Sequence, residues 1–474
     1  MANPIKFGTD GWRAVIADDF TFENVRYCAQ GFADYLKAKG LDKRGIAIGY
    51  DYRFASEDFA ATCAEVMAGN GIRTWLSPKA IPTPQVVFTL LAKRAGGGVI
   101  ITASHNPARW NGFKVREETG VSISSEVSAD VEKYVNLAAS TGKVNRMPLA
   151  QALEQKRVEY LDMTSEYLGQ ISRLVDSQKL RNAGYDIIID SMYGAGCGLF
   201  RQLLGGGTNR LTEINGERNP AFPGINPEPI APNLKKLSAM VVEQKANVGM
   251  ATDGDADRIG IIDEKGNFIT QLQTYALLAL YLLEVRGERG AIIKTVTSTS
   301  MLDRLGEIYK VPVYETPVGF KYVAPLFLKH KAIIGGEESG GYGFRGHVPE
   351  RDSLPAGLYI LDFMRQTGKA PSQLLEYLFG KVGPHYYDRI DLRFPTEARE
   401  QIIERVNKAS PQSIAGEKVV RTDTVDGFRF FLKDHSWLLI RFSGTEPVLR
   451  IYTETGKQDR VQKILQAGKE LTGL

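Results

Sequence analysis

Three aspartates separated by single residues are the most distinctive chemical feature of this sequence. Asp253, Asp255 and Asp257 follow a short apolar segment and come directly before Arg258. On an extended backbone alternate side chains share a face, so three carboxylates at this spacing can converge on one cation. Ligand sets made only of oxygen atoms favour Mg²⁺, Ca²⁺ or Mn²⁺ over zinc. The segment therefore predicts a divalent metal site, with a solvated acidic turn as the alternative.

The calcium loop of an EF-hand begins with the same spacing, and Glu264 stands where its twelfth residue would be. The sixth position of that loop requires glycine for a sharp turn, and here it is Arg258. The run from Arg258 to Asp263 is also typical of a strand. The sequence therefore argues against an EF-hand.

A serine just beyond a predicted strand is the second chemical feature. Val99–Ile101 is a β-branched run, and the polar segment Thr102–Pro107 ends it because proline cannot donate to a strand ladder. Ligands of α/β sheets bind beyond such strand ends. Ser104, with His105 beside it and Lys114 ten residues later, could be a nucleophile flanked by proton carriers. On spacing alone, an ordinary polar turn explains the segment at least as well.

The predicted metal site suggests a use for Ser104. Mg²⁺ is usually held by a few carboxylates together with phosphate oxygens. If Ser104 carried a phosphoryl group, the metal, Arg258 and Lys114 could neutralise the charge of that group during transfer.

Two further loops offer ligand groups. The segment 441–447, Arg-Phe-Ser-Gly-Thr-Glu-Pro, combines a guanidinium, two hydroxyls and loop N–H groups, which suits an anion, although a capped turn is an equal alternative. Glu337 and Ser339 could hydrogen-bond sugar hydroxyls, or could lie at a helix N-terminus. Neither a dinucleotide-binding fingerprint nor a nucleotide-binding P-loop is present.

Alternating strands and helices must position these loops, which is the pattern of α/β domains with largely parallel sheets. Three predicted strands end in polar, glycine-bearing loops, which suggests tandem duplication. From about Tyr386 the pattern changes to that of a small α+β domain. Expected helices are 22–39, 56–70 (capped by Ser56), 233–245, 275–285 and 396–408, and expected strands are 45–50, 72–76, 99–101, 185–190, 247–251, 291–296, 332–334 and 448–453.

Composition narrows the class of protein. The chain has 474 residues, and 59 basic against 55 acidic side chains leave a net charge of +4, without a basic stripe for nucleic acid or a polybasic patch for a membrane. Cys28, Cys63 and Cys197 are too few and too scattered for a disulfide framework and suit a reducing compartment. We expect no signal peptide, no membrane span and a cytoplasmic location.

Four motifs, taken in order, resemble those of the α-D-phosphohexomutase family. They are Thr102-Ala-Ser-His-Asn-Pro, Thr252-Asp-Gly-Asp-Ala-Asp-Arg, Gly336-Glu-Glu-Ser-Gly-Gly and Arg441-Phe-Ser-Gly-Thr-Glu-Pro. The resemblance covers nearly the whole chain. It implies three tandem, similar mixed-sheet α/β domains (1–145, 146–257 and 258–372) and a C-terminal α+β domain (373–474) around a central cleft.

The resemblance also implies the chemistry of an isomerase. The phosphoserine of this family gives its phosphoryl group to a hexose phosphate, and the bisphosphate intermediate returns the other phosphoryl group to the serine. The matching positions are Ser104 for the phosphoserine; Asp253, Asp255 and Asp257, with Ser104, for one Mg²⁺; Lys114 for a general acid/base; Arg13, His105, Arg258 and Lys294 for supporting positions; Glu337 and Ser339 for the sugar loop; Arg351 for a basic substrate contact; and Arg441, Ser443 and Thr445 for the distal phosphate.

The loop motifs also bear on the substrate. Glu-Glu-Ser at 337–339 is more similar to the loop of phosphoglucomutases than to the Glu-Met-Ser of phosphomannomutases or the Glu-Gln-Ser of phosphoglucosamine mutases. Ser-Gly-Thr-Glu-Pro is shared with the glucosamine group, but Phe442 replaces its typical proline, and Val318 replaces a histidine of the dual mannose/glucose enzymes.

We therefore expect a phosphoglucomutase that uses glucose 1,6-bisphosphate as intermediate and activator, with activity on mannose phosphates left open. A phosphoglucosamine mutase is one alternative, and a non-catalytic sugar-phosphate-binding regulator is another from a different class. The expected partners are hexose phosphates alone, without nucleic acid or membrane, and the expected state is a monomer or homodimer.

Overall fold

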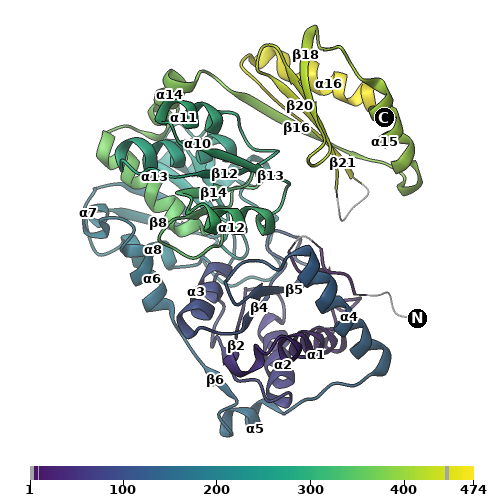
Figure 1. The fold of residues 1–474 in the computed structure, drawn as a ribbon. Helices are drawn as coiled ribbons and strands as arrows, with labels where there is room; N and C mark the ends of the chain where they lie inside the picture. The colour runs from purple at the N-terminus through teal and green to yellow at the C-terminus, as the bar shows by residue number, and fades with distance from the viewer. Residues whose placement is uncertain (1–4, 9, 444–447) are drawn as a thin grey trace.

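The computed structural model of the chain describes residues 5–8, 10–443 and 448–474 and contains four sheets along the chain (Figure 1). The first three sheets combine parallel with antiparallel strands and pack against helices, and the fourth sheet is antiparallel. This confirms the predicted class of three α/β domains followed by an α+β domain. None of the described helices has the length and apolar character that crossing a membrane would require.

The first sheet has the order β1-β5-β4-β2-β3-β6. β4 pairs with β2 in parallel and with β5 antiparallel, so the chain leaves β2 and β4 at the same edge of the sheet. Its strands are β1 (Trp12–Val15), β2 (Ile46–Tyr50), β3 (Thr74–Leu76), β4 (Gly97–Ile101), β5 (Trp110–Glu117) and β6 (Val158–Tyr160), and its helices are α1 (Phe22–Ala38), α2 (Ser56–Gly69), α3 (Thr83–Lys93), α4 (Ser125–Thr141) and α5 (Leu149–Glu154).

The second sheet has the order β11-β10-β9-β7-β8, with β7, β8 and β9 parallel. Its strands are β7 (Asp186–Asp190), β8 (Arg210–Ile214), β9 (Val248–Thr252), β10 (Ile259–Ile262) and β11 (Phe268–Ile269), and its helices are α6 (Thr164–Ser172), α7 (Ser177–Arg181), α8 (Leu199–Leu204) and α9 (Lys235–Gln244). β10 stands where an EF-hand loop would have to continue. Glu264 instead accepts a hydrogen bond from the main-chain N–H of Ser372.

The third sheet has the order β13-β12-β14-β15. Its strands are β12 (Ile292–Thr295), β13 (Val313–Thr316), β14 (Ile334–Gly336) and β15 (Tyr342–Phe344), and its helices are α10 (Gln271–Leu280), followed by a π-helical turn (Tyr281–Val285), α11 (Met301–Tyr309), α12 (Phe320–Lys329), α13 (Ser353–Thr367) and α14 (Pro371–Val382). The Glu337 loop joins the antiparallel strands β14 and β15. It is therefore a hairpin turn and not the helix N-terminus that was the alternative.

The fourth sheet has the order β16-β21-β20-β19-β18-β17 and is covered by two helices. Its strands are β16 (Tyr386–Arg393), β17 (Ser413–Ile414), β18 (Glu417–Asp423), β19 (Phe428–Leu432), β20 (Trp437–Phe442) and β21 (Val448–Thr455), and its helices are α15 (Arg399–Ala409) and α16 (Val461–Thr472).

Most predicted elements are present within a few residues of their expected ends, but the predicted cap of α2 is wrong. Ala55 is the N-cap residue, with a left-handed φ of 53°, and Ser56 is the first helical residue. The Ser56 hydroxyl donates to Asp51 instead. A short polar side chain favours a cap in isolation, but here a buried carboxylate competes for it. The predicted domain boundaries stay predictions; β6 joins the first sheet and β10 the second.

The apolar cores join the domains unequally. One large cluster contains residues of both the second and the third domain, for example Phe200 of the second and Leu354 and Tyr359 of the third. The core of the fourth domain consists of its own residues from Phe394 to Leu465. A small cluster of Val296, Trp437, Leu439 and Tyr452 connects it to the third domain.

Candidate active site

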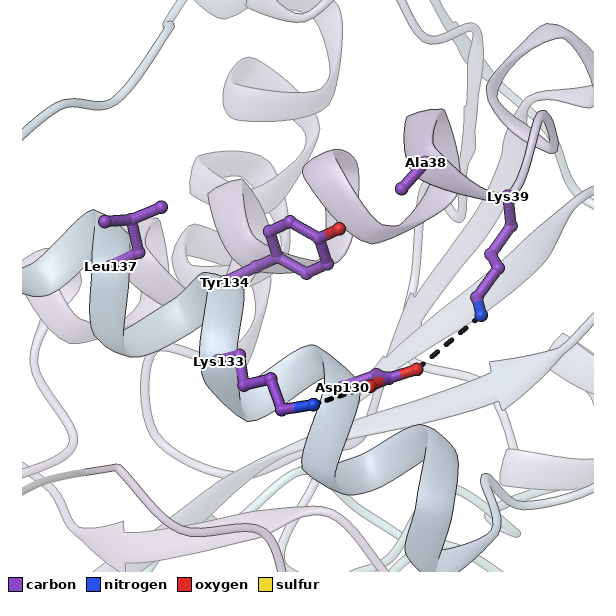
Figure 2. A pocket seen from close by; sticks show the side chains of 6 residues that line it. All are labelled: Ala38, Lys39, Asp130, Lys133, Tyr134 and Leu137. Atoms are coloured by element: carbon purple, nitrogen blue, oxygen red, sulfur yellow. Dashed lines mark hydrogen bonds and ion pairs between the residues drawn. The ribbon is translucent and has the colours of Figure 1, made fainter.

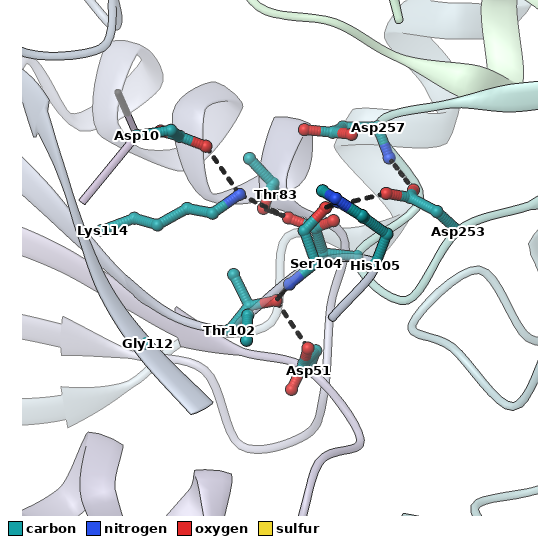
Figure 3. A network of polar contacts seen from close by, with 12 residues as sticks. Asp10, Asp51, Thr83, Thr102, Ser104, His105, Gly112, Lys114, Asp253 and Asp257 are labelled. Carbon is teal, nitrogen blue, oxygen red and sulfur yellow. Dashed lines mark hydrogen bonds and ion pairs between the residues drawn. The ribbon is translucent and has the colours of Figure 1, made fainter. Parts of the chain in front are cut away.

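Ser104 lies where the first and second domains meet. Its hydroxyl donates a hydrogen bond of 2.9 Å to Asp253 Oδ2, between residues 149 positions apart in the chain (Figure 3). The two loops touch so closely that a Cβ on Gly254 would lie 2.4 Å from the carbonyl oxygen of Ser104. Because only glycine lacks that atom, the metal loop, which is the segment 253–257 that carries the three aspartates, requires glycine at this position to approach the serine.

The main chain holds Ser104 in an unusual conformation. Its φ of 52° lies in the left-handed region, which non-glycine residues seldom occupy. Its N–H donates to Thr102 Oγ1 at 2.8 Å, and the Thr102 hydroxyl donates to Asp51 Oδ2 at 2.5 Å. His105 Nδ1 lies 3.4 Å from Ser104 Oγ. The serine is thus aimed by its surroundings, with an imidazole nearby.

Asp253, Asp255 and Asp257 converge as predicted, but they do so on a tight turn and not on an extended backbone, because the N–H of Ala256 donates to the carbonyl of Asp253 and Ala256 has a left-handed φ of 55°. One carboxylate oxygen from each lies within 4.8 Å of the others, and all three side chains are buried. Asp255 Oδ1 and Asp257 Oδ1 accept no hydrogen bond from the described part of the chain. Buried carboxylates without donors suit a hard divalent cation such as Mg²⁺.

The three carboxylates of this cluster repel one another and shift one another's pKa values. Burial raises the pKa of Asp253 well above its usual value, and the charges of Asp257 and Asp255 raise it further. Burial also raises the pKa of Asp257 to about 6, although Arg351 opposes this. For Asp255, burial raises the pKa, but Lys114, Thr83 and Arg351 together outweigh burial and lower the pKa below its usual range. A bound cation would relieve the repulsion that remains.

Lys114 lies between two carboxylates. Its Nζ is 2.9 Å from Asp255 Oδ2 and 2.8 Å from Asp10 Oδ2, and its side chain is fully buried. Burial lowers the pKa of Lys114, but Asp10 and Asp255 more than compensate and raise it above the usual value. Lys114 is therefore an ammonium that can donate a proton. Thr83 supports the same carboxylate, because its hydroxyl donates to Asp255 Oδ2 at 2.6 Å.

Asp10 is a shared partner for four cationic side chains. Its carboxylate lies 2.8 Å from Lys114 and 2.9 Å from Arg116, and it reaches Arg351 at 3.5 Å and Arg13 at 3.8 Å. Burial raises the pKa of Asp10, but the charges of Arg116, Lys114 and Arg351 hold it well below its usual range. Sequence reasoning did not identify this residue.

Two of the predicted arginines flank the serine and the triad. Arg13 Nη1 donates to Asn106 Oδ1 at 2.7 Å and to the carbonyl of Ala103 at 3.2 Å. Arg258 Nη1 lies 3.3 Å from Glu228 Oε1, and its Nε lies 3.8 Å from Asp253 Oδ2. Both guanidinium groups therefore lie beside the place where a phosphoryl group on Ser104 would carry charge.

Arg351 joins the metal loop to the sugar loop. Its Nη2 lies 2.6 Å from Asp257 Oδ2, and its Nη1 donates to Glu337 Oε2 at 3.0 Å. Burial raises the pKa of Glu337 above its usual value, although the charge of Arg351 opposes this rise. The Ser339 hydroxyl is buried and has no hydrogen-bond partner among the described residues, so it can serve a ligand.

Glu338 faces away from this group. Its Oε1 accepts hydrogen bonds from the Tyr387 hydroxyl at 2.9 Å and from Arg389 Nη1 at 3.0 Å, both on β16 of the fourth domain. The middle residue of Glu-Glu-Ser therefore takes part in a contact between domains, which limits its value as a marker of the sugar.

The predicted distal phosphate loop belongs to the fourth domain. Arg441 Nε donates to Asp426 Oδ2 at 2.9 Å, and the same oxygen accepts the N–H of Val318 from the third domain, also at 2.9 Å. The N–H of Ser443 donates to the carbonyl of Val448 at 2.8 Å. Thr445 lies outside the described residues.

Lys294 is on β12 of the third domain, hydrogen-bonded to Asp303 and within 3.6 Å of Glu315, which pairs with Arg429 of the fourth domain. Within 5–8, 10–443 and 448–474, no hydrogen bond or ion pair connects Lys294 or Arg441 directly to Ser104 or to the aspartate triad. The structure therefore places the predicted residues in two groups.

A surface groove of about 370 Å³ between α1 and α4 shares no lining residue with either group (Figure 2). It is lined by Lys39, Asp130, Lys133, Tyr134, Leu137 and Ala38. Asp130 pairs with Lys39 at 3.6 Å and with Lys133 at 3.1 Å, and both lysine side chains are largely exposed. These are ordinary solvated surface pairs.

Besides Thr83, sequence reasoning missed three charged residues that support the site: Asp10, Asp51 and Arg53. Asp51 and Arg53 follow β2, whose end lies at the same sheet edge as the end of β4. The strand-end rule that singled out Ser104 could have found them. Asp10 has no such local signal, because its partners are more than 100 residues away, apart from Arg13.

Comparisons with known proteins agree along the chain. Family models of phosphoglucomutase/phosphomannomutase match residues 4–141 (alpha/beta/alpha domain I), 165–266 (domain II), 271–382 (domain III) and 390–470 (C-terminal domain). A Thermococcus kodakarensis protein named "Phosphoglucomutase/phosphomannomutase" is 30% identical over 98% of both chains. A Thermococcus gammatolerans protein named "Probable phosphoglucosamine mutase" is also 30% identical, over 98% of this chain and 97% of its own.

Solved structures show the same likeness. One is a crystal structure of a Thermus thermophilus protein that carries the provisional name phosphomannomutase. It is 32% identical to this chain with a TM-score of 0.85, and the match covers 100% of both chains.

Proposed function

Because this chain belongs to the α-D-phosphohexomutase family, whose members are intramolecular phosphotransferases, we propose that it interconverts glucose 1-phosphate and glucose 6-phosphate through a phosphoserine at Ser104. The observation that carries this proposal is the 2.9 Å hydrogen bond from Ser104 Oγ to Asp253 Oδ2, beside a buried aspartate triad. It brings a hydroxyl nucleophile to the place where a cation would be held.

The proposed chemistry consists of two opposite transfers. A sugar hydroxyl attacks the phosphorus on Ser104, so the new sugar O–P bond forms as the P–Oγ bond breaks, and glucose 1,6-bisphosphate results. The bisphosphate then binds in the opposite orientation, and its other phosphoryl group moves to Ser104. In each transfer the proton of the attacking hydroxyl ends on the departing oxygen: it passes from the sugar to Ser104 Oγ in the first transfer and from Ser104 Oγ to the sugar in the second. In the second transfer Lys114 in its ammonium form can donate the proton to the departing sugar oxygen, and His105, whose Nδ1 lies 3.4 Å from Ser104 Oγ, can accept the proton of the serine.

Asp253, Asp255 and Asp257 are the residues that would hold Mg²⁺, with a phosphoryl oxygen on Ser104 as a further ligand. When bound, the ion supplies neutralising charge for the transferring group. Arg13 and Arg258 add fixed positive charge beside Ser104. This charge can neutralise the negative charge on the oxygens of the transferring phosphoryl group in a loose transition state.

Substrate contacts divide between the two groups of residues. Glu337 and Ser339 are placed to bind sugar hydroxyls, and Arg351 orients Glu337 through its 3.0 Å hydrogen bond. We assign the phosphate remote from the reaction to Arg441 and Ser443, with Thr445 of the same motif.

A phosphoglucosamine mutase is the second candidate. The names of several relatives at 28–30% identity favour it, as does the Ser-Gly-Thr-Glu-Pro motif. The Glu-Glu-Ser loop favours glucose, but Glu338 contacts the fourth domain. Coupled assays with the 1-phosphates of glucose, mannose and glucosamine decide between them, and the highest kcat/KM identifies the substrate.

The direct test of the mechanism is Ser104→Ala, with Ser140→Ala as a control because Ser140 is exposed on α4. We expect Ser104→Ala to lose mutase activity while it keeps its thermal stability, and the control to remain active. Intact-mass measurement should find one phosphoryl group on the unchanged protein after incubation with glucose 1,6-bisphosphate, and none on Ser104→Ala. Near-normal turnover by Ser104→Ala would contradict the mechanism, and a phosphoryl group that never leaves on addition of hexose phosphate would favour a non-catalytic regulator.

A further inference from the structure

The guanidinium of Arg53 donates hydrogen bonds to four main-chain carbonyl oxygens in the segment that carries Ser104. Its Nη2 donates to the carbonyls of Ser104 and Asn106 at 2.6 Å each, and its Nη1 donates to those of Pro107 and Trp110 at 3.0 and 2.9 Å. The side chain is 0% exposed. Because a guanidinium presents its donors in a rigid planar fork, these four carbonyls are fixed relative to one another.

Arg53 is itself held on several sides. Asp51 Oδ2 lies 3.2 Å from its Nε, and Asp51 Oδ1 accepts its main-chain N–H at 3.0 Å. The ring of Phe222, from the second domain, lies 5.1 Å from the guanidinium carbon. Asp51 also accepts the Thr102 hydroxyl, which in turn accepts the N–H of Ser104. One carboxylate therefore orients both the arginine and the main chain of the serine.

This support acts on a strained residue. A left-handed φ at a non-glycine residue persists only where the surroundings enforce it, and Ser104 has a φ of 52°. Its N–H is held through Thr102 and Asp51, and its carbonyl is held by Arg53. If the carbonyl were released, the main chain could relax, and Oγ would turn away from Asp253.

We propose that Arg53 is a positioning residue for phosphoryl transfer, which keeps Ser104 Oγ directed at the aspartate triad by binding the carbonyls of its loop. This inference rests on the role proposed above for Ser104. Arg53 itself touches neither the serine hydroxyl nor a triad carboxylate in any hydrogen bond or ion pair within the described residues.

The competing explanation is that Arg53 only satisfies buried carbonyls and thereby stabilises the first domain. Both explanations predict lower thermal stability after substitution, so stability alone cannot separate them. They differ in kcat: in-line transfer is sensitive to displacements of about 1 Å, which cost about 100-fold in rate. A purely structural role would leave kcat of the folded fraction unchanged.

The test uses Arg53→Lys, which keeps the charge but loses the planar fork, and Arg53→Ala. We expect Arg53→Lys to lower kcat by about 100-fold, with KM for the hexose phosphate close to that of the unchanged protein. Guanidinium ion at a low, non-denaturing concentration should restore part of the kcat of Arg53→Ala, and methylammonium should not. Arg181→Ala is the matched control, because Arg181 donates to the carbonyls of Leu203 and Gln202 far from the site.

The outcomes separate cleanly. Unchanged kcat in folded Arg53→Lys, or a loss in Arg53→Ala that guanidinium does not restore and that follows thermal stability, would overturn the inference. If Ser104→Ala is inactive and Arg53→Lys is normal, only this inference fails. If Ser104→Ala is active, the proposed function fails first.

Discussion

The two groups of predicted site residues are built in opposite ways. At the reacting end, Ser104, Lys114 and the aspartate triad are buried, and they come from the first two domains, with Arg351 of the third. At the distal end, the side chain of Arg441 is 13% exposed and its described ion pair is with Asp426. The reacting end is therefore assembled across domains, whereas the phosphate loop of the distal end belongs to a single domain with a separate core.

This difference suits the two demands of the proposed reaction. Phosphoryl transfer needs charges and reacting atoms fixed before the reaction begins, because reorganisation would raise the barrier. A bisphosphate that must bind in two orientations needs a distal site that can release it. The fourth domain meets the third through a small apolar cluster and polar bridges, among them the ion pair of Arg429 with Glu315, which is the kind of interface that permits domain motion.

Removal of the divalent cation should have the largest effect, and it should act at the reacting end. Without it the three buried carboxylates repel one another, and the transferring group loses its main counter-charge, so we expect a loss of activity of about a thousandfold. The measurement is mutase activity after exhaustive chelation and then after return of Mg²⁺.

Two further results check this first prediction. Added Mg²⁺ should raise the unfolding temperature of the chelated protein, and Asp257→Asn should reduce that rise. Full activity in protein shown by elemental analysis to be metal-free would contradict a catalytic cation.

Asp10→Asn should have an intermediate effect, because it removes the shared anion of Lys114, Arg116 and Arg351 without removing a reacting group. We expect kcat to fall by about 10- to 100-fold, since general acid–base groups contribute about 10²–10⁴-fold and Asp255 still orients Lys114. Steady-state kinetics measure this change. Asp130→Asn, on an exposed ion pair of α4, is the control and should be unaffected.

The same residue predicts a dependence of stability on pH. The folded pKa of Asp10 is depressed, so its ionised form stabilises the fold above the unfolded pKa of about 3.9, and this stabilisation is lost as the pH falls toward the folded pKa. Asp10→Asn should therefore lose less stability than the unchanged protein on acidification below about pH 4. Parallel acid unfolding curves for the two proteins would refute this assignment.

The reacting end was largely predictable from the sequence because its main residues follow strands. Ser104 follows β4, Asp253 follows β9 and Glu337 follows β14, and each strand has a local apolar signature. These strands belong to three different sheets. Because ligand groups of α/β sheets lie just beyond strand ends, the local pattern of each strand sufficed to find the site residue that follows it. The exclusion of an EF-hand also followed from one local fact, Arg258 in place of glycine.

What local patterns could not predict are partners that come from other domains. Nothing near Asp10 indicates Arg116 or Arg351, which reach it through the packing of the first and third domains. Similarly, Glu338 was a substrate marker in the motif, yet the fold directs it to Tyr387 and Arg389. Side-chain direction within a hairpin turn depends on the neighbour that packs against it.

Asp426→Asn should have the smallest effect and should act at the distal end alone. Asp426 holds Arg441 at 2.9 Å and also accepts the N–H of Val318, so it connects the phosphate loop to the third domain. An amide keeps an acceptor for Val318 but loses the charge for Arg441, a partly exposed pair worth about 1 kcal/mol at most. We expect KM for glucose 1-phosphate to rise up to about fivefold with kcat nearly unchanged, measured by steady-state kinetics. Asp434→Asn, in another turn of the same domain, should change neither constant. A fall in kcat with unchanged KM would instead mean that the two ends act as one unit, and the division between a fixed reacting end and a separable distal end would have to be given up.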